Sequence, residues 1–492
     1  MTVAETRYGK VRGAQIADGV LGWRGIPYAQ PPVGALRFRP PAPPEPWSGV
    51  RDALAYGNRS LQPELGPGPV PDAPPMDEDC LYLNVAAPAG ASGRPVLFWL
   101  HGGGYEMGEG SNQAGDGVAF AKSHGLVVVT VNYRVGALGF LDLPGEQPTG
   151  AAGLHDQIAA LRWTHENIAA FGGDPDQITV YGLSAGGKSV TNLLASPLTA
   201  GLIARAAESS GGDHVKDPAQ ARALTRRFLR ELGTTAQVLR SVPAADILHA
   251  QLAIAPMPRS TWIWRPSVDG VALIGSPLTA IAAGSAADIP LLLQTCAREC
   301  ALYALLAPDG PSQADRVLAG YFGQETTAKL LAGYAARYPE LDGDALRTVI
   351  MTDERYVVRT ERLAAAQAVH APVWRSRYDG PYTGLDDDPD PAFAQYAPLL
   401  RAAHGGDGTA IWQGSGGGDD DASVTAALHN AWGAFATTGD PGWAQYTSID
   451  RSTMIFTEDG PSLSADPFAD ARGAWAGLDW QPGSWWPLDA VS

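Results

Sequence analysis

Continuous apolar runs and helical periodicity alternate through the first half of the chain. Residues 95–100 (PVLFWL), 125–133 (GLVVVTVNY) and 177–182 (QITVYG) are short and almost wholly apolar. Runs of this kind are typical of strands that are buried on both faces of a sheet. Residues 155–173, which lie between the second and third runs, carry apolar side chains at helical spacing and stop at two glycines. The pattern therefore predicts strands that alternate with helices.

The same alternation continues further along the chain. Residues 188–197 have a helical pattern that Pro197 ends, and residues 202–212 are typical of another strand. Two late apolar runs, at residues 289–295 and 371–378, predict further strands. Such alternation favours an α/β architecture, in which a mostly parallel central sheet has helices on both faces.

Two long segments interrupt this alternation. Residues 215–285 and 300–370 are rich in helical patterns, and we expect them to form insertions over the sheet. Residues 25–47 are rich in proline and glycine, which predicts extended chain and turns. The sequence shows no internal repeat and no clean linker, so residues 1–492 are predicted to form a single domain.

Composition and charge narrow the possible functions. The 492 residues carry a formal net charge of −17, which repels nucleic acid and anionic membrane surfaces. The sequence has no apolar stretch of membrane-spanning length and no signal-peptide pattern at its start. Cys80, Cys296 and Cys300 are too few for a disulfide framework, and no histidine cluster accompanies them. We therefore expect a cytoplasmic protein without a bound metal.

A Gly-x-Ser-x-Gly pattern, from Gly182 to Gly186, is the first candidate for chemistry. It joins the strand predicted at 177–182 to the helix predicted at 188–197. On a sharp strand-to-helix turn, the small residues avoid clashes and the serine side chain is presented at the start of the helix. A serine hydroxyl is a weak nucleophile that needs a base, a group to orient that base, and donors for the oxyanion. Ser184 is thus a candidate nucleophile.

A glycine-rich segment supplies candidate oxyanion donors. Residues 101–105 (HGGGY) directly follow the strand predicted at 95–100. Consecutive glycines leave backbone N–H groups accessible, which is what a developing oxyanion requires. In the arrangement that accompanies a serine elbow, the N–H groups of Gly103 and Gly104 act together with that of Ala185.

On this architecture, the acid and the histidine are expected to follow the serine in chain order. His404 lies in a glycine-containing segment after the last predicted strand, whereas His249 and His429 fall within helical patterns and His370 ends one. Glu299 follows the strand predicted at 289–295 and is the favoured acid. Asp269 is the competing candidate, although an aspartate in its setting commonly forms a turn.

Taken together, the motifs resemble those of the type-B carboxylesterases, the family that includes cholinesterases and bacterial para-nitrobenzyl esterases. The matching segments follow one another along almost the whole chain, at residues 25–41, 78–85, 101–105, 131–141, 153–187 and 432–443. The resemblance implies an α/β-hydrolase fold with helical insertions over the active site. It also implies hydrolysis of small-molecule carboxylic esters through an acyl-enzyme, with no cofactor.

The resemblance assigns roles to particular residues of this chain. It implies a triad of Ser184, Glu299 and His404, which agrees with the choice made from the residues alone. Ser210 matches a buried serine that supports the triad in the family. The implied oxyanion donors are Gly103, Gly104 and Ala185.

The sequence departs from the family pattern at several positions. Leu183 stands where the family usually has glutamate, and Lys188 stands where it usually has a small residue. These changes remove one negative charge and add one positive charge beside the nucleophile, so we expect a general carboxylesterase biased away from cationic esters. Ser60 stands where extracellular members have the cysteine partner of Cys80, which is therefore expected to be unpaired. Gln294 replaces a common glycine.

A buried lysine needs a partner or access to water. A salt bridge is the plainer expectation for Lys188, and contact with an acidic or polar group of the substrate is the sharper one. Glu106 and Glu109 either lie exposed, pair with Lys188 or line the mouth of the site. Aromatic candidates for the substrate pocket are Tyr105, Trp262, Trp264 and Trp412, although aromatic residues of this kind more often belong to a core.

Other functions share the same machinery. A Ser-His-acid site also serves carbamate or amide hydrolysis and acyl transfer to an alcohol. Some relatives of the family are adhesion proteins that lack the serine, but here all three triad positions and the glycine segment are present. The sequence leaves the acyl group, the alcohol group and the oligomeric state open.

Overall fold

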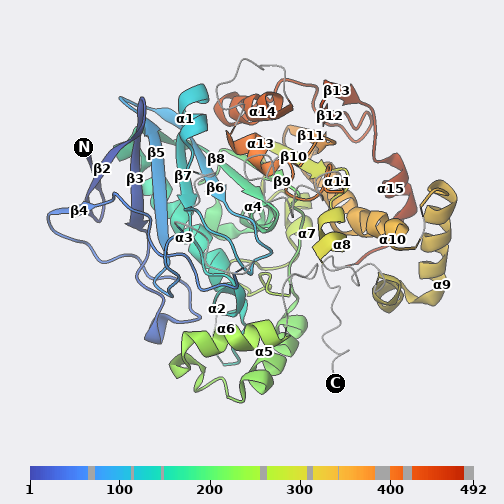
Figure 1. The fold of residues 1–492 in the computed structure, drawn as a ribbon, viewed down its shortest axis with the longest axis horizontal. Helices are drawn as coiled ribbons and strands as arrows, with labels where there is room; N and C mark the ends of the chain where they lie inside the picture. The colour runs from blue at the N-terminus through green and yellow to red at the C-terminus, as the bar shows by residue number, and fades with distance from the viewer. Residues whose placement is uncertain are drawn as a thin grey trace.

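The computed structural model describes residues 1–64, 73–111, 116–145, 149–254, 263–306, 314–341, 343–382, 399–413 and 424–480. Within these ranges, thirteen strands form one sheet (Figure 1). Twelve of them follow the order β1-β2-β3-β5-β7-β6-β8-β9-β10-β11-β12-β13, and β4 pairs with β2.

The centre of the sheet is parallel, as the continuous apolar runs predict. Adjacent strands are aligned in register, with Phe98 opposite Val129 on one side and Val180 on the other. The parallel strands are β6 (Arg94–Leu100), β7 (Val127–Val131), β8 (Gly173–Leu183), β9 (Arg205–Ser209), β10 (Leu291–Cys296), β11 (Val373–Tyr378) and β12 (Thr453–Thr457).

Both faces of this sheet are covered, because successive side chains of a strand point to opposite faces. Val96 and Phe98 of β6 join the hydrophobic cluster that contains Leu161 and Leu193, whereas Leu97 joins another that contains Trp432. The first cluster is covered by α3 (Ala152–Asn167), η3 (Ile168–Phe171), α4 (Ala185–Ala195) and α11 (Val358–Gln367). The second is covered by α1 (Val118–His124), α13 (Gly408–Gln413) and α14 (Val424–Thr438).

The edges of the sheet are antiparallel, and the sequence did not predict these strands. Residues 25–47 were expected to be only extended chain and turns, but β3 runs into the start of this segment. Burial along β2 is interrupted by partly and fully exposed positions, so β2 lacks the continuous apolar run of a buried strand. The antiparallel strands are β1 (Thr2–Thr6), β2 (Gly9–Ala17), β3 (Val20–Pro27), β5 (Tyr82–Pro88) and β13 (Gly460–Ser464). The short β4 (Val50–Asp52) runs parallel to β2.

The described parts of the two predicted insertions are helix-rich, as expected. The first contains α5 (Pro218–Leu232), η5 (Leu239–Ser241), α6 (Ala244–Ile254) and α7 (Pro277–Ala282). The second contains α8 (Ala301–Leu306), α9 (Ala314–Arg337), α10 (Gly343–Thr352), the π-helical turn η7 (Asp353–Val357) and α11. In Figure 1, α5 and α6 lie at the bottom and α9 at the right, away from the sheet.

The remaining short elements are η1 (Gly34–Leu36), α2 (Gly136–Phe140), η4 (Pro197–Thr199) and α15 (Ala469–Ala474). Among the described helices, none has the length and apolar character that crossing a membrane requires.

Candidate active site

Ser184 lies on a sharp turn between the end of β8 and the start of α4. Its backbone has φ 59° and ψ −118°, a conformation that a residue with a side chain rarely adopts. The turn is packed so tightly that a Cβ on Gly186 would lie 2.0 Å from the carbonyl oxygen of Leu100. A Cβ on Gly182 would lie 2.2 Å from the carbonyl carbon of Gly186. The two glycines therefore allow the chain to present Ser184 at the N-terminus of α4.

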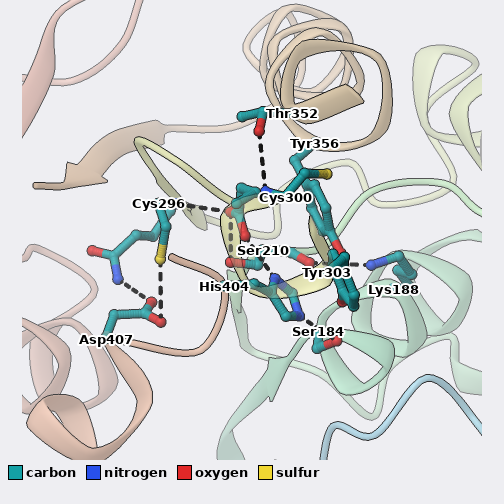
Figure 2. Close-up of polar contacts among 12 residues, drawn as sticks. Ser184, Lys188, Ser210, Cys296, Cys300, Tyr303, Thr352, Tyr356, His404 and Asp407 are labelled. Atoms are coloured by element: carbon teal, nitrogen blue, oxygen red, sulfur yellow. Dashed lines mark hydrogen bonds and ion pairs between the residues drawn. The ribbon is translucent and has the colours of Figure 1, made fainter. Parts of the chain in front are cut away.

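The structure brings Ser184, His404 and Glu299 together. Figure 2 shows Ser184 beside His404. The Ser184 hydroxyl lies 2.8 Å from Nε2 of His404, and Nδ1 of His404 lies 2.6 Å from Oε2 of Glu299. Glu299 is fully buried, and Ser184 and His404 are each only 6% exposed. With Nδ1 protonated and donating to the carboxylate, Nε2 is free to accept the serine proton.

Backbone pairing joins the segments that carry Glu299 and His404. The N–H of Arg298 donates to Ala402, and the N–H of His404 donates to the carbonyl of Glu299. The competing acid, Asp269, instead accepts a hydrogen bond from Nε2 of His155 and from two backbone N–H groups of its own turn. Of the two candidate acids, Glu299 is therefore the one that contacts His404.

The second carboxylate oxygen of Glu299 is also held. Oε1 accepts hydrogen bonds from the Ser210 hydroxyl at 2.7 Å and from the backbone N–H of Cys296 at 2.8 Å. Ser210 has a backbone φ of 53°, in the left-handed region. This contact places Ser210 where the family resemblance expects a serine that supports the triad.

The glycine segment lies against the nucleophile. A Cβ on Gly102 would lie 3.0 Å from the carbonyl of Leu183 and 3.2 Å from the Ser184 Cβ. Gly103 and Gly104 have φ values of 105° and 65°, which glycine adopts without strain. The segment thus passes close beside Ser184, next to the N-terminus of α4.

Two tyrosines that the sequence did not indicate pack against His404. The ring centroids of Tyr303 and Tyr356 lie 5.3 Å and 5.0 Å from that of the imidazole, and their hydroxyls are 3.0 Å apart. Both come from the second helical insertion, Tyr303 from α8 and Tyr356 from the π-helical turn η7. Neither lies in a motif, so no signal in a single sequence links them to His404.

Lys188 is 1% exposed and lies one turn after Ser184 on α4. Its ammonium group donates to the carbonyl oxygen of Ser210 at 3.2 Å and lies 4.7 Å from the ring centroid of Tyr356. Burial lowers the pKa of Lys188 to about 7, and the nearby carboxylates of Glu299 and Glu208 oppose this shift. Burial likewise raises the pKa of Glu208 to about 7.

Several pocket candidates lie elsewhere. Tyr105 is fully buried, and its ring packs against Phe140 while its hydroxyl accepts a hydrogen bond from Ser189. Its hydroxyl is thus satisfied within the protein core, and a role of Tyr105 in a substrate pocket stays a prediction. Trp264 and Trp412 also belong to hydrophobic clusters, and Trp262 lies outside the described residues.

The two acidic candidates differ from each other. Glu106 is buried directly after the glycine segment, and its backbone N–H donates to Gly103. Glu109 accepts a hydrogen bond from the Ser111 hydroxyl at 2.6 Å. Leu183 is half-buried beside the nucleophile. A role of these three residues in substrate choice stays a prediction.

Gln294 has a clear structural partner. Its side-chain amide donates to the buried carboxylate of Asp407, and its carbonyl oxygen accepts from Ser376. Asp407 lies three residues after His404, and burial raises its pKa above the usual value.

Within the described ranges, no group of three or more His, Cys, Asp or Glu side chains is placed to hold a metal ion.

The cysteine arrangement agrees with the sequence. Cys80, Cys296 and Cys300 are all buried free thiols. Burial raises the pKa of Cys80 to about 12, and Ser60, at the position of the missing cysteine partner, hydrogen-bonds to its sulfur. The expectation that Cys80 is unpaired is confirmed.

The parallel sheet, the serine elbow and the bonded histidine and glutamate are those of the α/β-hydrolase class of serine hydrolases. The carboxylesterase family matches residues 1–459 of this chain. A para-nitrobenzyl esterase of Bacillus subtilis is 37% identical over 486 residues, covering 96% of this chain and 97% of that protein. A phenmedipham hydrolase of Pseudarthrobacter oxydans is 33% identical, covering 94% and 97%.

Solved structures agree with these sequence matches. A para-nitrobenzyl esterase structure superposes with a TM-score of 0.82 at 35% identity, covering 96% of this chain and 99% of that one. A carboxylesterase of Geobacillus stearothermophilus also gives a TM-score of 0.82, at 36% identity and with 96% and 100% coverage. The chain belongs to the carboxylesterase family, and it is a carboxylic ester hydrolase.

Proposed function

We propose that Ser184, His404 and Glu299 hydrolyse a small-molecule carboxylic ester by two-step acyl transfer. The observation that carries the proposal is the unbroken hydrogen-bond chain from the Ser184 hydroxyl through His404 to Glu299. His404 takes the serine proton as the oxygen attacks the ester carbonyl, and then gives it to the departing alcohol. Water, deprotonated by His404, attacks the acyl-enzyme and releases the carboxylic acid.

The backbone N–H groups of Gly103, Gly104 and Ala185 are proposed to bind the oxyanion of each tetrahedral intermediate. The close approach of the glycine segment to Ser184 supports this assignment. Such donors are fixed before the reaction, so they stabilise the developing charge without reorganisation. The loss of one donor of this kind typically costs about 10²–10³ in rate.

A fluorophosphonate probe tests the nucleophile directly. We expect one phosphonyl group per chain, attached to the peptide that contains Ser184, because His404 activates only this hydroxyl. Intact-mass and peptide mass spectrometry measure the label, and Ser184→Ala is the blank. Labelling of another serine, or equal labelling of the Ser184→Ala variant, contradicts the proposed function.

Leu183 is proposed to bias the enzyme against cationic esters. It places an uncharged side chain beside the nucleophile, and the buried amine of Lys188 lies one helical turn away. Leu183→Glu is expected to raise kcat/KM for a quaternary-ammonium thioester by about 3–10-fold relative to its neutral isostere, since a carboxylate attracts the cation. Steady-state rates on the two thioesters measure this ratio.

Leu183→Gln is the matched control, because it adds a side chain of the same size without the charge. An equal change in both variants, or no change in Leu183→Glu, contradicts an electrostatic bias at this position.

A reducing, cytoplasmic location and the absence of a nucleic-acid partner are also proposed. The three free thiols support the first, and the net charge of −17 supports the second. Fractionation of the producing cells tests the location, and recovery outside the cytoplasmic fraction contradicts it.

A further inference from the structure

Lys188 is the one titratable side chain of α4, and it points toward the residues that hold the triad (Figure 2). Its ammonium group donates to the carbonyl oxygen of Ser210. A lysine this deeply buried is costly unless its polar contacts compensate for the lost hydration. The contacts of Lys188 therefore indicate which role a lysine has at this position.

The first contact fixes Ser210. This residue has a left-handed backbone, with a φ of 53°, that a non-glycine residue adopts only when its surroundings hold it there. The surroundings act on three of its groups. The N–H donates to the carbonyl of Gln294 at 2.8 Å, the hydroxyl donates to Glu299 at 2.7 Å, and the carbonyl accepts from Lys188. Lys188 thereby reaches Glu299 through a single intervening residue.

The second contact holds Tyr356, whose ring packs against His404. The Lys188 ammonium lies 4.7 Å from the centroid of the Tyr356 ring, within the range of a cation–π interaction. The same ring packs against the imidazole of His404, and its hydroxyl is bonded to that of Tyr303. Two of the contacts of Lys188 therefore reach residues that support the triad, Ser210 at the acid and Tyr356 at the base.

We propose that Lys188 is a positioning residue for acyl transfer, which holds Ser210 and Tyr356 in place through its ammonium group. The inference rests on the proposed function of the triad and goes beyond it. Lys188 does not need to touch substrate, because it acts through the two residues that orient Glu299 and His404.

The charge of Lys188 is set by the groups around it. Its usual pKa falls to about 7, first through burial and then through the positive charge of Arg355, whereas Glu299 and Glu208 act in the opposite direction. The lysine is therefore mostly neutral above about pH 7 and charged below it. The titratable or charged groups that face it are Glu208, His214, Glu299, Cys300, Arg355 and Tyr356.

The sign of the pH effect follows from this arrangement. In the acidic range the ammonium is a positive charge held against Ser210 and Tyr356, and it opposes the addition of another positive charge close by. Removal of the amine ends this opposition. The acidic limb of the kcat/KM profile is then expected to move to higher pH by about half a unit.

Two variants separate position from charge. Lys188→Met is expected to lower kcat about 10-fold, with KM within about twofold, because Glu299 and His404 lose their alignment while binding is unchanged. Lys188→Gln retains a donor for the Ser210 carbonyl, so it is expected to recover most of kcat while keeping the shifted acidic limb. Both are measured on a neutral ester across pH 5–9, with thermal unfolding to verify the fold.

Lys216 offers a matched control. It is also buried, its pKa is also lowered to about 7 by burial, and it donates to the carbonyl of Phe140 rather than to the triad supports. Lys216→Met is expected to lower stability without changing the shape of the pH profile.

Three outcomes would overturn the inference. A pH profile of Lys188→Met and Lys188→Gln that matches the wild type removes the role of charge. A kcat of Lys188→Met that matches the wild type removes the role in positioning. A change confined to the ratio of rates on anionic and neutral esters makes Lys188 a substrate contact. Failure of the wild type to react with fluorophosphonate would instead refute the proposed nucleophile, so the two proposals fail separately.

Discussion

Ser184→Ala is expected to lower kcat/KM on an activated ester by about 10⁴–10⁶-fold. The variant removes the only atom that forms the covalent intermediate, while the glycine segment and the substrate site remain. The rate that survives reflects oxyanion binding and water attack within an intact site. Stopped-flow and steady-state measurements with a para-nitrophenyl ester give both the rate and the loss of the acyl-enzyme burst.

Ser189 supplies the control for this prediction. It is another buried serine of α4, and its hydroxyl donates to Tyr105 rather than to His404. Ser189→Ala is expected to retain activity within a few-fold, because it alters the same helix without touching the nucleophile. A loss of less than 100-fold in Ser184→Ala would show that the hydrolysis proceeds elsewhere.

Glu299→Gln is expected to lower kcat by about 10⁴-fold with the fold intact. The glutamine amide can turn its NH₂ group toward Nδ1 of His404, which then becomes an acceptor and places the imidazole proton on Nε2. A protonated Nε2 cannot accept the proton of Ser184. The charge that stabilises the imidazolium during attack is lost as well.

Glu208 provides a control for this prediction, because Glu208→Gln also removes a buried carboxyl group. Glu208 is also fully buried, but its carboxylate accepts a hydrogen bond from Thr191 and does not contact His404. Glu208→Gln is expected to keep kcat within about 10-fold, since an amide oxygen can still accept that bond. Equal losses in the two variants, compared at matched thermal stability, would argue against Glu299 as the orienting acid.

The central sheet and the triad were predictable because their signals are local. Apolar runs such as residues 95–100 are long enough to identify a strand buried on both faces, and the elbow around Ser184 has a steric requirement visible as two glycines. The sequence favoured Glu299 over Asp269, but the pairing of Arg298 with Ala402, which brings Glu299 to His404, is visible only in the folded chain. Strands such as β2 were missed because exposed positions interrupt their apolar pattern.

The support around the triad was not predictable, for a different reason. Tyr303 and Tyr356 meet His404 only after segments about a hundred and about fifty residues away along the chain are folded together. The sequence could identify Lys188 as unusual, and the cost of burying an amine required that it have a partner. It could not identify that partner as a backbone carbonyl, because the Ser210 carbonyl and Lys188 meet only in the folded chain.

The π-helical turn at Asp353–Val357 determines how far α11 is rotated about the helix axis relative to α10. Each residue turns an α-helix by about 100°, so the wider turn changes which residues of α11 continue the face of α10. Ile350 of α10 and Val358 of α11 both pack with α9, whereas Leu363 of α11 packs under the sheet. Deletion of one residue between them would act as a rotation, carrying the Tyr356 ring away from His404 without changing any side chain. Along this stretch of helix, the residue types determine the chemistry, and the number of residues determines the direction in which each side chain points.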